Sequence, residues 1–133
     1  MSKYLKTASV LSIAVAIYAT LAFAQDPVTV SPTIYKTHLD NERVRVLEVT
    51  VKPGEATAFH SHPDYTVYVI EGGMVRFFST PADTGVAVEL KTGSVSWHGA
   101  EVHSGKNVGT TTLRILVTEL KEPKPEMIKK ESK

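Results

Sequence analysis

Three of the five histidines in this 133-residue sequence are spaced so that they could bind one metal ion. His60 and His62 are two residues apart, and residues i and i+2 of a β-strand point to the same face. Two imidazoles could therefore converge on an ion without any bend in the backbone. His103 would complete the set from a neighbouring strand. Taken alone, a His-x-His pair is also compatible with a structural or solvent-facing role, so the spacing leaves both interpretations open.

Other residues near these histidines are weaker candidates for chemistry. Asp64 has the parity of the histidine pair and could add a carboxylate, although its place at a turn favours a capping or surface role. Tyr68 has the same parity, and could either donate a hydrogen bond to a metal-bound ligand or pack inside the protein. His98 and Glu101 could act as a base and its orienting group, or be solvated loop residues. We expect Trp97 to fill the core or to line a ligand pocket.

The composition excludes several classes of protein. The sequence has no cysteine, which excludes disulfide scaffolds, thiolate zinc sites, iron–sulfur clusters and thiol nucleophiles. Lys and Arg number 15 against 14 Asp and Glu, so no basic field would attract nucleic acid, and we expect no such partner. No nucleophile elbow, phosphate-binding glycine loop or His-Glu-x-x-His helix is present. The chemistry therefore rests on the histidines.

The elements that position them are predicted to be β-strands. Residues 33–120 are rich in Val, Ile, Thr and aromatic residues, with turn signals every 8–12 residues, as in all-β sandwiches and barrels. We expect strands at residues 43–51, 66–70, 74–79, 86–90, 94–97 and 111–120. Residues 71–73 read as a hairpin turn that pairs the second of these strands with the third. Residues 26–31 read as an extended lead-in, because two prolines disfavour a helix.

The spacing of glycines around the histidine pair resembles the first conserved motif of the cupin superfamily. The residues that match it are Gly54, His60, His62, Thr66 and Gly73. A second stretch resembles the second cupin motif, and its matching residues are Gly93, His103 and Asn107. The spacing between Gly93 and His103 is one residue shorter than usual.

The resemblance implies an all-β, single-domain jelly-roll β-barrel over residues 33–120, with a metal ion in its mouth. Cupins commonly use a glutamate as fourth ligand where this sequence has Thr66. The expected site is therefore His60, His62 and His103 as neutral imidazoles plus water, as in cysteine-dioxygenase-type cupins. The divalent ion could be iron, manganese, zinc, nickel or copper. Small cupins often pair, so we expect a homodimer.

The two ends of the sequence differ from this central block. Residues 1–24 have a basic start, an apolar stretch at 7–19 and an Ala-Phe-Ala sequence ending at Ala24, which together predict a cleaved secretory signal peptide. The apolar stretch is short for a membrane span, so an uncleaved anchor is the weaker alternative. We therefore expect a periplasmic protein with no stable membrane insertion after cleavage. Residues 121–133 form a charged tail.

Two functions of different classes remain. The first is a metal-dependent enzyme, of the oxygenase type or a Lewis-acid lyase or isomerase, acting on a small molecule that chelates the ion. The second is a non-catalytic periplasmic module that binds a small ligand or metal. The same open site would serve both functions, and the fold alone does not choose between them.

Overall fold

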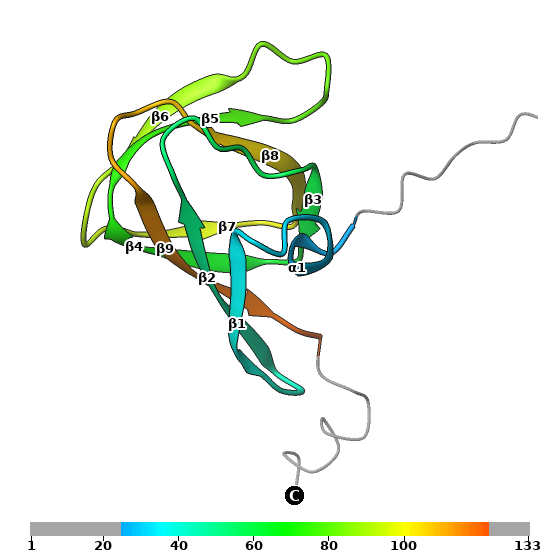
Figure 1. Ribbon diagram of the computed structural model, residues 1–133. Helices are drawn as coiled ribbons and strands as arrows, with labels where there is room; N and C mark the ends of the chain where they lie inside the picture. Colours follow the sequence, from blue (N-terminus) through cyan, green and yellow to red (C-terminus); the bar gives the residue numbers. More distant parts are fainter. Residues whose placement is uncertain (1–24, 123–133) are drawn as a thin grey trace, which may run out of the picture.

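Nine strands form two antiparallel sheets in the computed structural model, which describes residues 25–122. The five-stranded sheet has the order β1 (Tyr35–Asp40), β2 (Val44–Val51), β9 (Leu113–Leu120), β4 (Tyr65–Glu71), β7 (Val95–His98). The four-stranded sheet has the order β3 (His60–His62), β8 (Glu101–Asn107), β5 (Gly73–Phe78), β6 (Val86–Leu90). Strands far apart in the sequence lie side by side in both sheets (Figure 1). The predicted all-β jelly-roll barrel is confirmed.

Alternating side chains build the interior of the barrel. In β2, Leu47, Val49 and Val51 are buried, whereas the residues between them are only partly covered. β2 pairs along its whole length with β9, whose buried residues Leu113 and Val117 face the same interior. Alternation of this kind places one apolar face of each sheet inside the barrel.

The six predicted strands all occur, with ends within two residues of the predicted ones. The hairpin between residues 66–70 and 74–79 is wrong, because β4 and β5 belong to different sheets. The chain changes sheet at Gly72, where a Cβ atom would lie 2.1 Å from the Leu90 carbonyl oxygen. Two adjacent glycines therefore mark a corner between sheets here and not a hairpin turn.

A short helix, α1 (Pro27–Val30), precedes the barrel and corrects the prediction of an extended lead-in. The Asp26 carboxylate accepts hydrogen bonds from the Val28 and Thr29 amides, at 2.9 and 3.3 Å. Proline is well suited to the first helical position because its missing N–H has no partner there in any case. The carbonyl of Gln25, just before the cap, accepts a hydrogen bond from the Ser61 amide, and this fastens the N-terminal segment to β3.

Residues 25–122 contain no helix that is long and apolar enough to cross a membrane. The predicted signal peptide at 1–24 lies outside the described residues, as does the predicted tail beyond residue 122. Lys121, at the start of that tail, still donates its backbone N–H to the Arg43 carbonyl at 2.9 Å.

Candidate metal centre

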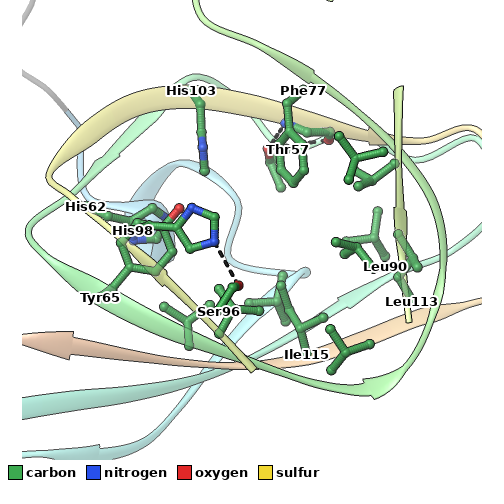
Figure 2. A pocket seen from close by; sticks show the side chains of 18 of the residues that line it. Thr57, His62, Tyr65, Phe77, Leu90, Ser96, His98, His103, Leu113 and Ile115 are labelled. Atoms are coloured by element: carbon green, nitrogen blue, oxygen red, sulfur yellow. Dashed lines mark hydrogen bonds between the residues drawn. The ribbon is translucent and has the colours of Figure 1, made fainter. Parts of the chain in front are cut away.

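The pairing of β3 with β8 brings the three predicted histidines together. His60 lies directly opposite His103 in the antiparallel register, and His62 follows His60 on the same face. One nitrogen from each ring lies within 4.8 Å of the others. His60 and His62 are buried, and the His103 side chain is 12% exposed. Figure 2 shows His62 and His103 at one end of a cavity, with Tyr65 and His98 beside them.

Hydrogen bonds fix which ring nitrogens of His60 and His62 are free. His60 Nδ1 lies 2.7 Å from the Ala58 carbonyl oxygen, which can only accept, so Nδ1 carries the proton. His62 Nδ1 donates to the Glu119 carboxylate at 2.6 Å in the same way. The two Nε2 atoms lie 3.0 Å apart, and with both rings neutral their lone pairs face each other. The Tyr35 hydroxyl lies 2.9 Å from His60 Nε2 and forms a hydrogen bond with it.

Glu101, the first residue of β8, lies beside the third histidine. Its carboxylate lies 3.3 Å from His103 Nδ1, within ion-pair distance. The same carboxylate accepts a hydrogen bond from the Tyr65 hydroxyl. Glu101 thus orients other groups, and it lies at the start of a strand rather than in a loop.

Glu119, which sequence reasoning missed, is the buried carboxylate of the centre. It accepts from His62 on one oxygen and from Arg45 Nε on the other, each at 2.6 Å. Arg45 in turn donates to Asp26, the cap of α1, at 2.5 Å. One signal in the sequence could have found Glu119, because it continues the inward alternation of Leu113, Ile115 and Val117 with a charged residue.

The environment favours neutral imidazoles and an ionised glutamate. Burial lowers the pKa of His60 below its ordinary value. Burial and the neighbouring His60 lower the pKa of His103 to about 4. Burial alone would raise the pKa of Glu119, but hydrogen bonds from His62 and Arg45 lower it overall. Neutral imidazoles with free lone pairs are the state that a metal requires.

The two tyrosines remain protonated donors. Burial raises the pKa of Tyr35 well above its ordinary value, and the charge of Glu119 raises it further. Burial and the hydrogen bond to Glu101 likewise raise the pKa of Tyr65. Each hydroxyl can therefore donate a hydrogen bond near the histidines over the whole neutral range.

These shifts predict acid sensitivity of the metal-free protein. Unfolded histidines bind protons below a pKa of about 6.5, whereas the folded His103 does so only near 4, so stability is full above 6.5 and falls as the pH drops. We expect His103 to account for a loss of about 2 kcal/mol between pH 7.5 and 5. Urea unfolding with a chelator present measures this change in the free energy of unfolding, which should be smaller in His103→Leu. An equal loss in both proteins would contradict the assignment.

The donor set fits a divalent metal. Two nitrogens that each lie about 2.1 Å from one ion are about 3 Å or slightly more apart, as the two Nε2 atoms of His60 and His62 are. His60 and His62 are also oriented through their other nitrogens by hydrogen bonds to a carbonyl and a carboxylate, which is the usual arrangement around ligating histidines.

Asp64 and His98 lie outside the three-histidine group. The Asp64 carboxylate accepts from the Ala100 amide at 2.9 Å, the loop-capping role that its turn position suggested. The His98 ring stacks on Tyr65, with ring centres 4.8 Å apart, and forms a 2.9 Å hydrogen bond with the Ser96 hydroxyl. His98 and Ser96 both line the cavity beside the histidines (Figure 2).

Tyr68 and Trp97 correct two expectations. Their side chains are 45% and 58% exposed, and neither lines the cavity. The inward residues of β4 are Tyr65, Val67 and Val69. Alternation continued from His60 and His62 would have placed the even-numbered residues inside, so the pattern is shifted by one residue. Strand alternation does not continue through the turn between β3 and β4, because these strands belong to different sheets.

Because of the same one-residue shift, Thr66 does not face the cavity, as a fourth ligand would have to. Thr66 does not line the cavity and pairs with the exposed Trp97. We expect Thr66→Glu to leave divalent-metal affinity within about two-fold of wild type, since a carboxylate there faces outward. Calorimetric zinc titration of both proteins measures this, and a clear gain in affinity would show that residue 66 reaches the ion.

A cavity of about 500 Å³ extends from the histidines into the barrel. Its volume is in the range of small-molecule sites. Beyond the histidine end the walls are mainly valine, leucine, isoleucine and phenylalanine side chains.

Solved structures share this architecture. The chain is similar to a cupin domain from Bordetella pertussis Tohama I, at 30% identity and a TM-score of 0.61, over 67% of this chain and 93% of that one. It is also similar to an RmlC-like cupin family protein with a double-stranded β-helix fold from Methanocaldococcus jannaschii, at 15% identity and a TM-score of 0.53, over 72% and 84% of the two chains. A conserved protein with a double-stranded β-helix domain from Klebsiella pneumoniae matches at 22% identity and a TM-score of 0.52, over 65% and 70%. No protein-family model and no curated protein sequence matches the chain.

Proposed function

Because the chain belongs to the cupin superfamily, we propose that His60, His62 and His103 hold a divalent metal ion and leave positions open for a small molecule. One observation carries this proposal. The buried Nε2 atoms of His60 and His62 lie 3.0 Å apart, and the Nδ1 atom of each ring donates to another acceptor. Buried acceptors at this distance repel each other unless a cation or a shared donor lies between them.

We propose further that the protein is a metal-dependent enzyme acting on a small chelating molecule. The bound ion would supply Lewis-acid or redox chemistry at its open positions. Glu119 and the Ala58 carbonyl orient two of the rings, and the Tyr35 hydroxyl can donate a hydrogen bond to a ligand at the centre. The apolar walls of the cavity exclude water from the far side of the ligand.

A second candidate is a non-catalytic module that binds a small ligand or metal. The observation that favours it concerns the groups proposed for proton transfer. Glu101 accepts from Tyr65, and His98 Nε2 is hydrogen-bonded to Ser96, while His98 Nδ1 and the Glu101 carboxylate lie 3.7 Å apart without a hydrogen bond between them.

Elemental analysis followed by a dioxygen-consumption screen tests the proposal. Protein purified without added metal should contain close to one equivalent of a transition metal, and chelating acids should trigger oxygen uptake or turnover. Tight ligand binding without turnover would favour the module. Protein that remains free of metal after incubation with iron, manganese, zinc, nickel and copper would refute the metal centre.

We also propose that the protein acts in the periplasm as a homodimer. The signal-like sequence at residues 1–24 supports export. Exposed Tyr68, Val95 and Trp97 on the five-stranded sheet, next to the free edge of β7, favour pairing. Light scattering at tens of micromolar should give a dimer mass, and a monomer mass would count against pairing.

A further inference from the structure

The cavity has two ends of different chemistry. At one end lie the three histidines with Tyr35, Tyr65 and His98. Toward the other end, Figure 2 shows Leu90, Leu113 and Ile115 on the side of the cavity away from His62 and His98. Val69, Val75 and Phe77 belong to the same apolar wall.

Two polar side chains along the apolar part, those of Thr57 and Ser94, are already occupied, whereas Glu89 and Lys91 line the cavity at exposed positions. Thr57 is buried, and its hydroxyl accepts from the Gly105 amide at 2.9 Å and lies 3.5 Å from the Gly105 carbonyl. The Ser94 hydroxyl donates to the Lys91 carbonyl at 2.6 Å. A ligand with hydroxyl groups along its length would therefore bury them without partners, which is costly.

The inward face of β6 is apolar as well, although the exposed Glu89 and Lys91 also line the cavity there. Val86 and Val88 pair with Phe77 and Val75, so they share the inward face of the four-stranded sheet. They are nevertheless 67% and 40% exposed, because β6 is the last strand of that sheet. A ligand that enters here passes apolar side chains before it reaches the histidines.

We infer that the ligand is an amphiphile with one compact chelating or anionic head and an unbranched or lightly branched apolar body. The head binds at the histidine centre, and this part of the inference rests on the proposed metal function. The body fills the space between the valine, leucine and phenylalanine walls and gains affinity by leaving water. A sugar or another polyhydroxylated molecule does not fit this wall.

Straight-chain hydroxamic acids from two to twelve carbons test the inference on the zinc-loaded full chain. Their head group is constant and chelates zinc, so calorimetry isolates the effect of the body. We expect affinity to rise about four-fold per added methylene until the cavity is full, and then to stop rising. The six-carbon polyhydroxylated analogue, gluconohydroxamic acid, should bind no better than the two-carbon acid.

Ile115→Phe and its neighbour Leu116→Phe form a matched pair. Ile115 lines the cavity, whereas Leu116 is the next residue on β9 and does not. Ile115→Phe should shorten the hydroxamic acid that binds most tightly, and Leu116→Phe should leave that length unchanged. Leu90→Phe on the edge strand β6 is a second filling variant if Ile115→Phe does not fold.

The same titrations distinguish failure of the inference from failure of the metal proposal. If zinc binds and affinity does not depend on chain length, the amphiphile is refuted and the metal centre stands. If zinc does not bind and the metal-free chain still shows the length dependence, the apolar body is supported and the metal centre is refuted. Equal binding of gluconohydroxamic and hexanohydroxamic acids would also overturn the inference.

Discussion

His103→Ala should lower the affinity for divalent metals by more than a hundred-fold while the barrel stays folded. Loss of a residue that merely orients a metal ligand costs about 10–100-fold, so loss of one of three ligands should cost more. His103 sits on a paired strand, and its ring faces the other two histidines and the Glu101 carboxylate. Competition with a chromogenic chelator measures the affinity, and circular dichroism monitors the fold.

His38→Ala is the matched control for this experiment. His38 lies on β1 and forms a 2.7 Å hydrogen bond with Glu48 at the surface. Its removal should leave metal affinity unchanged. If His103→Ala binds metal as tightly as His38→Ala does, the three-histidine centre is wrong.

The sequence predicted these three histidines well because strand alternation is a short-range rule. His60 and His62 need only a three-residue strand to point the same way, and β3 provides it. His103 was expected to come from a neighbouring strand, and β8, which was not among the predicted strands, places it opposite His60. Local spacing together with a known motif was therefore enough for the histidines themselves.

Counting residues across a turn did not reliably predict which face of a strand a side chain lies on. Tyr68 was counted from His62 through two residues that join different sheets, and it came out on the wrong face, as did Thr66, which the family motif had placed at the fourth-ligand position. The pairing of β4 with β5 failed for a similar reason, since a jelly roll connects its two sheets at such corners. Which strands pair depends on the packing of the whole barrel, and local turn signals do not contain that information.

The groups that support the histidines come from distant parts of the chain. Tyr35, Ala58 and Glu119 reach the site from three separate segments. No motif spacing links them to the histidine pair. Their roles follow only from the tertiary structure, although the inward parity of Glu119 marked it as an unusual charged residue.

Glu119→Gln should both weaken metal binding and destabilise the protein. Gln keeps an oxygen that can accept from His62 Nδ1 but loses the charge that polarises the ring, so metal affinity should fall about 10–100-fold. Arg45 loses its buried partner and keeps only the more exposed Asp26, which should cost roughly 2 kcal/mol. For a domain of this size that lowers Tm by about 10 °C. Zinc titration and thermal unfolding of the metal-free protein measure the two effects.

Two further variants separate the role of Glu119 in positioning His62 from its role in stability. Glu71→Gln removes a surface carboxylate that pairs with Arg114 at 3.0 Å, and should change the free energy of unfolding by less than about 1 kcal/mol. Replacing the buried pair together, as Arg45→Met with Glu119→Leu, should regain much of the stability lost in Glu119→Gln, since no charge remains buried without a partner. Metal affinity should stay low in that double variant, because His62 Nδ1 has lost its acceptor. If metal affinity instead recovers together with stability, Glu119 supports the fold alone and does not position His62.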